Sequence, residues 1–182
     1  TSNRAVAQLS PEVLEAAKEF APEWVGDSAG HRKALAAAEA ATRQGAATHL
    51  LGERGTGKRS IARFMAQRWS DQVTEIACSK VRERSDALVE EAVAHVHDGG
   101  SLILLDVEAL PVPVSEALAA GLSQVDMPRV VMTLRRPTPS ATKLISSVHS
   151  VEIAVPPLGS RREDIAALAT HFIEAVSDKA PS

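Results

Sequence analysis

The sequence predicts an α/β fold in which helices cover both faces of a five-stranded parallel sheet. Stretches with strand and helix patterns alternate five times, as in strand–helix–strand units with right-handed crossovers. One strand, 101–106, is continuously apolar up to its closing acid, which is typical of a strand buried on both faces. A glycine-rich loop, 52–60, separates the first strand from a helix, and we expect the functional site there.

Local signals define the elements of the N-terminal half. Ser10 and Pro11 are a typical helix cap and first helical residue, so we expect a helix that reaches Phe20. A second helix should occupy 30–44 and end at Gly45, because glycine readily adopts the left-handed conformation that follows a helix. Beyond it we expect strands at 48–51 and 73–78, a helix from the loop to residue 69, and a helix at 82–97 with its apolar residues on one face.

Prolines separate the elements of the C-terminal half. A turn at 111–113 follows the apolar strand, prolines at 137–139 break the chain again, and Pro156 and Pro157 stop the last strand. We expect strands at 129–134 and 151–155 and helices at 114–122, 141–148 and 161–176, the last capped by Ser160.

The composition excludes several classes of protein. Aromatic residues make up 3% of the chain and the net charge is −3, so neither a stacking platform for single-stranded nucleic acid nor a DNA-binding surface is indicated.

Cys78 is the single cysteine, which fits a reducing compartment, and we expect it to be a buried, inert thiol. His95 and His97 stand two apart on a helix and do not face each other, so they predict no metal pair. With no signal segment or long apolar run, we expect a soluble cytoplasmic domain outside the membrane.

The loop matches the phosphate-binding pattern G-x-x-x-x-G-K between a strand and a helix. Its glycines allow positive φ and a close approach to an anion, its N–H groups should point inward, and the helix adds its positive end. Lys58 can reach terminal phosphates as a mobile charge. The predicted nucleotide-binding residues are Gly52, Glu53, Arg54, Gly55, Thr56, Gly57, Lys58, Arg59 and Ser60. The alternative is a glycine-rich turn that binds nothing.

Two positions near the loop depart from the usual chemistry. Arg59 stands where a Ser or Thr should hold Mg²⁺, and Ser60, one place late, is the substitute metal ligand that we predict. Arg59 is either solvated or paired with phosphate or with Asp106. Asp106 is predicted as the Mg²⁺ acid and the catalytic carboxylate, with a strand-end cap as its alternative role.

Several stretches together resemble the AAA+ domain of bacterial enhancer-binding transcription activators, the proteins with a sigma-54 interaction domain. Residues 25–28 resemble that family's V-G-x-S, 52–58 match its G-E-x-G-T-G-K, and Cys78 stands at the end of the second strand as in the family. Residues 99–102 resemble its G-G-T-L, and 151–165 resemble its V-x-I-x-L-P-P-L-R-E-R-x-x-D-I. The resemblance covers the chain from about residue 24 to its end.

The resemblance implies a P-loop AAA+ three-layer fold, ATP or ADP as ligand, Mg²⁺, and self-association as a ring. It implies a role in transcription initiation with RNA polymerase and its sigma factor, with DNA bound through domains outside this chain. Val25 and Gly26 match the stretch that contacts the adenine in the family. The expected division is an N-terminal helix and linker at 1–22, a nucleotide-binding subdomain at 23–158, and the first helix of a truncated lid at 159–182.

The departures from the family concern hydrolysis and partner contact. The sigma-contacting G-A-F-T-G-A loop is missing after Cys78, and the arginine-finger positions hold Ala141 and Ser147. Gly159 replaces the first arginine of the tail motif. In the Walker B strand, either Leu105 occupies the Asp position and Asp106 the Glu position, or Asp106 is the metal acid and Val107 its partner, with Glu108 pointing away.

The remaining polar residues have two interpretations each. Thr133 is either a polar sensor at the end of the fourth strand or an ordinary strand threonine. Two arginine pairs, Arg135–Arg136 and Arg161–Arg162, are either solvated or bound to a neighbouring subunit or to a phosphate. We therefore expect an ATP-binding regulator module with weak or no hydrolysis. The alternatives are a working ATPase that uses Glu108 or Arg135, and a scaffold that binds no nucleotide.

Overall fold

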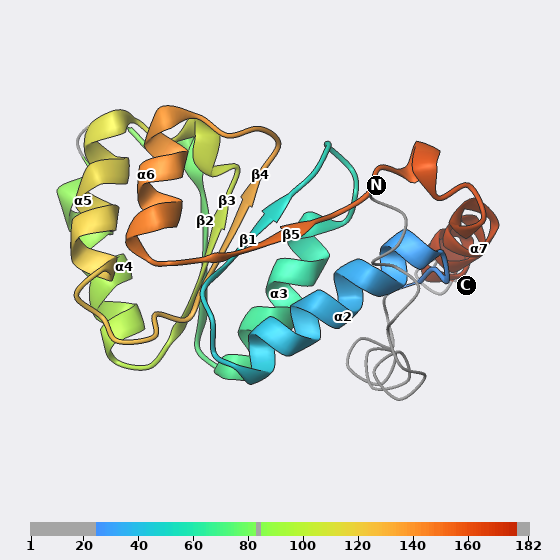
Figure 1. Ribbon diagram of the computed structural model, residues 1–182, viewed down its shortest axis with the longest axis horizontal. Helices are drawn as coiled ribbons and strands as arrows, with labels where there is room; N and C mark the ends of the chain where they lie inside the picture. Colours follow the sequence, from blue (N-terminus) through green and yellow to red (C-terminus); the bar gives the residue numbers. More distant parts are fainter. Residues whose placement is uncertain (1–24, 83–84, 178–182) are drawn as a thin grey trace, which may run out of the picture.

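The computed structural model describes residues 25–82 and 85–177, which form a parallel sheet between two layers of helices (Figure 1). The strand order is β2-β3-β4-β1-β5, and all the pairings are parallel. The strands are β1 (Thr48–Leu51), β2 (Val73–Ala77), β3 (Ser101–Leu105), β4 (Val130–Leu134) and β5 (Val151–Ala154). The prediction of a five-stranded parallel α/β fold is confirmed. The predicted helix at 10–20 lies outside the described residues.

The helices divide between the two faces of the sheet. Figure 1 shows α2 (Ala29–Arg43) and α3 (Lys58–Trp69) on one face and α4 (Asp86–His97), α5 (Val112–Leu122) and α6 (Pro139–Ser147) on the other. The last helix, α7 (Asp164–Ser177), lies beyond the first turn of α2, away from the sheet. Three short 3₁₀ turns complete this part of the chain: η2 (Cys78–Lys80), η3 (Val107–Ala109) and η4 (Leu158–Ser160).

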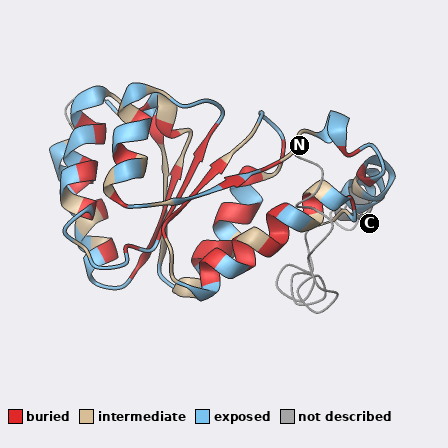
Figure 2. Ribbon diagram, in the orientation of Figure 1, coloured by how far each residue is buried: buried red, intermediate tan, exposed pale blue. Residues whose placement is uncertain are grey.

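Strand β3 is buried on both faces, as its apolar run predicts. Leu102 and Leu104 belong to the core under α4, α5 and α6, whereas Ile103 belongs to the core under α2 and α3. All three side chains are fully buried, and burial of each contributes about 1.5–3 kcal/mol relative to an exposed side chain. Figure 2 shows the central strands as the most buried part of the chain.

Some predicted boundaries are wrong because 3₁₀ turns occupy the ends of the predicted elements. β3 ends at Leu105, since Asp106 has left-handed backbone angles. The helix expected from residue 82 begins at Asp86, after η2. The helix expected from residue 161 begins at Asp164, because η4 precedes it and Ser160 is not its cap.

The topology creates a crevice at the carboxyl ends of β1 and β4. These strands are neighbours, but β1 continues into α3 on one face while β4 continues into α6 on the other. In open parallel sheets such a change of face leaves room for a ligand beyond the strand ends. The glycine-rich loop follows β1 and therefore lies at this crevice. Within 25–82 and 85–177, no helix has the length and apolar composition to span a membrane.

Candidate functional site

The glycine-rich loop connects β1 to α3 in a conformation that requires its glycines. Gly55 and Gly57 have φ of 79° and 94°, in the left-handed region that side chains disfavour. Gly52 has no positive φ, so that part of the prediction is wrong. It is required for a different reason, because a Cβ there would lie 2.6 Å from the carbonyl oxygen of Val155, the residue that follows β5.

The loop leaves its backbone donors available. Among the described residues, no N–H group from residue 53 to residue 60 donates a hydrogen bond to a protein acceptor. Gly57 precedes the first turn of α3 and supplies no side-chain cap. Unbonded donors at the start of a helix, together with the helix dipole, form an anion-binding site.

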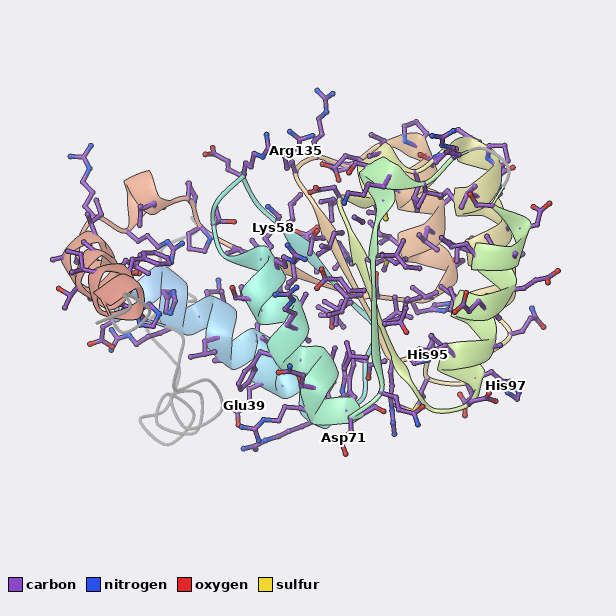
Figure 3. The ribbon with its side chains drawn as sticks, turned by 180° about the vertical axis from the view of Figure 1, so that it is seen from behind. Glu39, Lys58, Asp71, His95, His97 and Arg135 are labelled. Carbon is purple, nitrogen blue, oxygen red and sulfur yellow. The ribbon has the colours of Figure 1, made fainter. Side chains whose placement is uncertain are left out.

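Lys58 lies under this loop and is 7% exposed. Its ammonium donates to the carbonyl oxygens of Gly52 (2.7 Å) and Glu53 (2.6 Å). An ammonium has three donors, so the third remains for a ligand. Burial lowers the pKa of Lys58, and the carboxylates of Asp106 and Glu108 oppose that shift. Figure 3 shows Lys58 at the loop end of α3 and Arg135 at the same edge of the sheet.

A cleft of about 520 Å³ opens over the loop. Its walls come from two sides: the loop forms one and the ends of β3 and β4 form the other. The structure thus brings Lys58 together with Asp106 and Thr133, which the sequence singled out. The lining residues are 54–59 of the loop and Ser79, Leu105, Asp106, Ala109, Thr133 and Arg135.

Asp106 is held at the cleft in a strained conformation. Its φ and ψ are both 56°, and its N–H donates to the Thr133 hydroxyl at 2.9 Å. A left-handed backbone at a residue other than glycine costs about 1–3 kcal/mol and persists where neighbouring contacts impose it. Thr133 therefore positions Asp106, in addition to lining the cleft. Leu105 lines the cleft as well. The Walker B position for the metal-binding Asp therefore faces the cleft whether Leu105 or Asp106 is aligned with it.

Glu108 does not line the cleft, but it is paired with Arg135, which does. The η3 turn brings its carboxylate to the end of β4, where Oε1 accepts from the Arg135 backbone N–H (3.1 Å) and Nε (3.0 Å). The Glu108 side chain is 6% exposed, and its Oε2 has no hydrogen-bond partner in the described part of the chain. Arg135 is thus an ion-pair partner that also lines the cleft.

Arg59 is exposed on the first turn of α3, as the first of its two interpretations predicts, and its side chain is 58% accessible to solvent. Its guanidinium pairs with Glu75 on β2, which also accepts hydrogen bonds from Arg63 at 2.7 and 3.3 Å. Burial tends to raise the pKa of Glu75, but the hydrogen bonds from Arg63 and Arg59 outweigh it and lower that pKa. This cluster fixes the outer side of α3 against the edge of the sheet.

The C-terminal segment contains a buried arginine that sequence reasoning missed. The sequence left Arg161 either solvated or engaged at a subunit interface or a phosphate, but it is 5% exposed and contacts the loop of its own chain at Thr56. Arg162 is exposed as expected. The resemblance of 151–165 to P-P-L-x-x-R-x-x-D-I was the available signal, because Arg161 and Asp164 are its charged positions and both are buried.

Other predicted residues lie outside the cleft lining. Val25 and Gly26 are half-buried, and Gly26 packs directly against the Asp164 carboxylate. Gly52 and Glu53 offer their carbonyls to Lys58 instead. Ser60 is exposed on the first turn of α3.

The two arginine-finger positions carry no charge and lie in α6. Ala141 is fully buried in the core, and the Ser147 hydroxyl donates to the Leu144 carbonyl. Cys78 is buried as predicted, and its burial and the nearby carboxylates of Asp106 and Glu108 raise its pKa to about 12.

The two histidines form no metal pair. Figure 3 shows His95 and His97 at the far end of the molecule from Lys58, and they have separate partners, Ser101 and Asp98. The described ranges contain no cluster of three or more metal-ligating side chains.

Comparison with known proteins identifies the fold. No protein-family model matches the chain, and no curated protein matches it in sequence. The structure of NtrX from Brucella abortus in complex with ADP superposes with a TM-score of 0.74 at 18% identity over 93% of this chain, and the complex with ATP with 0.72 at 19% identity over 97%. The RuvB Holliday junction branch migration motor from Thermotoga maritima superposes with 0.53 at 17% identity over 73%.

The fold is the three-layer α/β fold of P-loop AAA+ proteins. The chain covers 46% and 50% of the two NtrX chains and 46% of the RuvB chain, so it spans about half the length of these proteins. These identities are low, and the likeness shows the architecture.

Proposed function

We propose that this chain is an ATP-binding AAA+ module of a bacterial transcriptional regulator related to sigma-54-dependent activators. The observation that carries the proposal is the loop at 53–60, where the N–H groups have no protein acceptor among the described residues and where the buried Lys58 ammonium binds the carbonyl oxygens of Gly52 and Glu53. The NtrX chains of similar fold were solved with ADP and with ATP, which supports a nucleotide as the ligand.

Each part of the cleft has a role in this proposal. The loop donors and Lys58 hold the phosphates, since together they supply oriented N–H groups and a positive charge. Among the described residues, Asp106 is the one carboxylate that lines the cleft, and its oxygen suits Mg²⁺. Ser60 is the other proposed metal ligand, although it is exposed on α3. Val25 and Gly26 remain the proposed adenine contacts, on the resemblance alone.

We expect weak or absent hydrolysis. Phosphoryl transfer depends on positioned charge, and an arginine finger alone contributes on the order of 10³–10⁵ in rate. Ala141 and Ser147 offer no such charge, and Asp106 has no second carboxylate beside it in the cleft lining. Binding should therefore persist while turnover is slow.

Titration calorimetry with ATP and ADP, with and without Mg²⁺, tests the binding proposal. The chain should bind both nucleotides, and Lys58→Ala should weaken binding at least about tenfold, because it removes a charge that contacts the terminal phosphates. The exposed variant Arg162→Ala is the control and should bind like the wild type. No heat at millimolar nucleotide would favour the scaffold alternative and overturn the proposal.

An active ATPase is the second candidate, because Glu108 is better placed than its sequence position suggested. Its buried Oε2 has no partner in the described chain, and its charge acts on Lys58. A base that activates water needs such a carboxylate near the phosphates. Steady-state phosphate release separates the two candidates: rapid turnover that Glu108→Gln abolishes would replace the binding-only proposal.

The partners are proposed from the resemblance alone. We expect self-association as an AAA+ ring and, for the whole protein, contact with RNA polymerase and DNA through parts outside this chain. The short η2 turn stands where the family has its sigma-contacting loop, so contact with a sigma factor would need another surface. A cytoplasmic location follows from the same proposal.

A further inference from the structure

A buried arginine joins the C-terminal segment to the loop and to α2. Arg161 follows η4 and precedes α7, and it is 5% exposed. Its Nη2 donates to the Thr56 carbonyl oxygen at 3.0 Å, and its Nη1 donates to His31 Nδ1 at 3.1 Å. A buried charge is costly unless it is hydrogen-bonded, so these contacts determine where the guanidinium lies.

The bond to Thr56 orients a donor of the loop. The Thr56 carbonyl and the Gly57 N–H belong to one planar trans peptide and point in opposite directions. Because Arg161 binds the carbonyl, the Gly57 N–H points away from Arg161. Gly57 lines the cleft, and its N–H has no acceptor within 25–82 or 85–177. Arg161 thereby sets the direction of one anion-binding donor.

A second anchor holds Arg161 in place. The Asp164 carboxylate is 1% exposed and accepts from the N–H groups of Asp27 (2.8 Å) and Ser28 (2.9 Å) and from the Ser28 hydroxyl (2.6 Å). Gly26 closes the contact, since a Cβ there would lie 2.9 Å from the carboxylate. Ser28 is also the N-cap of α2. The start of α7 is therefore fastened to the start of α2.

We propose that Arg161 is a positioning residue for nucleotide binding, which couples the docking of 158–164 and α7 to the conformation of the loop. The proposal rests on the proposed function for its nucleotide, whereas the link between Arg161 and the loop holds without one. Coupling is reciprocal: if docking favours the binding conformation, nucleotide must favour docking by the same factor. Binding of nucleotide at the loop would then stabilise the docking of α7, which lies outside the cleft.

Three variants test the coupling. Arg161→Met removes both hydrogen bonds while keeping apolar bulk, and Arg161→Lys keeps the charge on a single nitrogen that cannot span both acceptors as the guanidinium does. Arg162→Met changes an exposed neighbour and serves as the control. The readouts are ¹⁵N order parameters of residues 53–58 without nucleotide, ATP and ADP affinity by calorimetry, and amide exchange of α7 with and without ATP.

For Arg161→Met we expect lower order in the loop, affinity for both nucleotides weakened about tenfold, and loss of the protection that ATP gives to α7 in the wild type. Arg161→Lys should recover part of each effect, and Arg162→Met should match the wild type. A folded Arg161→Met chain with wild-type loop order, affinity and ATP-dependent protection would overturn the proposal.

The outcomes separate this proposal from the proposed function. If the wild type binds no nucleotide but Arg161→Met still loosens the loop, the nucleotide assignment fails and the positioning role stands. If Arg161→Met does not fold, Asp164→Asn loosens the same docking and leaves the guanidinium in place. It should lower loop order and affinity in the same direction, and unchanged values for a folded Asp164→Asn chain would contradict the coupling.

Discussion

At the scale of single residues, the cleft depends on side chains that hold one another in unusual states. Asp106 adopts a left-handed backbone because Thr133 binds its N–H, and Lys58 is buried against two loop carbonyls. Sequence patterns located both residues but could not show these contacts. Thr133 lies on β4, 27 positions from Asp106, and only the sheet brings the two together.

Asp106→Asn tests the metal role of the carboxylate. Asparagine tolerates the left-handed conformation about as well as aspartate, so the fold should be retained with a loss of stability under about 1 kcal/mol. We expect that Mg²⁺ no longer tightens ATP binding, since the charged ligand is gone. Calorimetry at matched nucleotide concentrations measures this, with the exposed Asp98→Asn as control. Undiminished Mg²⁺ dependence in Asp106→Asn would show that the metal acid is elsewhere.

Cys78 should resist thiol reagents in the folded protein. Its thiol is fully buried, and its pKa of about 12 leaves little thiolate near neutral pH, although thiolate is the reactive form. Mass spectrometry after iodoacetamide treatment at pH 7.5 should find it unmodified, while urea-unfolded chain is alkylated. Rapid labelling of native protein would show that the end of β2 opens more readily than its burial implies.

At the scale of elements, the sequence predicted which helices and strands are present better than it predicted the residues at which they begin and end. The strands follow from apolar runs, and the loop from its glycines, because these signals are local. The sequence could not predict the partners of Arg59, Glu108 and Arg161. These partners are Glu75, Arg135 and Thr56, and they come from distant parts of the chain. Gly52 was predicted to need a positive φ, but it is required because the backbone that follows β5 leaves no room for a Cβ.

The docking of α7 should depend on the ionisation of Asp164. Burial tends to raise the pKa of Asp164, but hydrogen bonds from Ser28 and Asp27 outweigh it and lower that pKa. The carboxylate therefore stabilises the fold fully above its unfolded pKa near 3.8, and this contribution is lost as pH falls through the lower folded value.

Urea unfolding from pH 7 to pH 2.5 measures this contribution. Asp164→Asn should cost about 1–3 kcal/mol at pH 7, because a charged acceptor with several donors is lost. The difference from the wild type should shrink below pH 4 as the Asp164 carboxylate of the wild type is protonated. The exposed Glu163→Gln is the control. A difference that stays constant down to pH 2.5 would mean that the charge of Asp164 is not what docks α7.

At the scale of the whole molecule, the parallel sheet places the ligand site. Neighbouring β1 and β4 send the chain to opposite faces, and the loop, Asp106 and Thr133 meet at the crevice between them. Alternation of elements in the sequence was enough to predict the sheet. It did not predict that the C-terminal segment returns to the loop, since that depends on how α7 docks on α2.

The central claim is that the loop donors and Lys58 hold a nucleotide, and backbone ¹H–¹⁵N spectra test it most directly. On addition of ATP, the amides of residues 53–60 should show the largest shifts, because their N–H groups gain phosphate acceptors. Lys58→Ala should require at least about tenfold more ATP for the same shifts. Spectra that do not change at millimolar ATP, or that change only at residues remote from the loop, would contradict the claim.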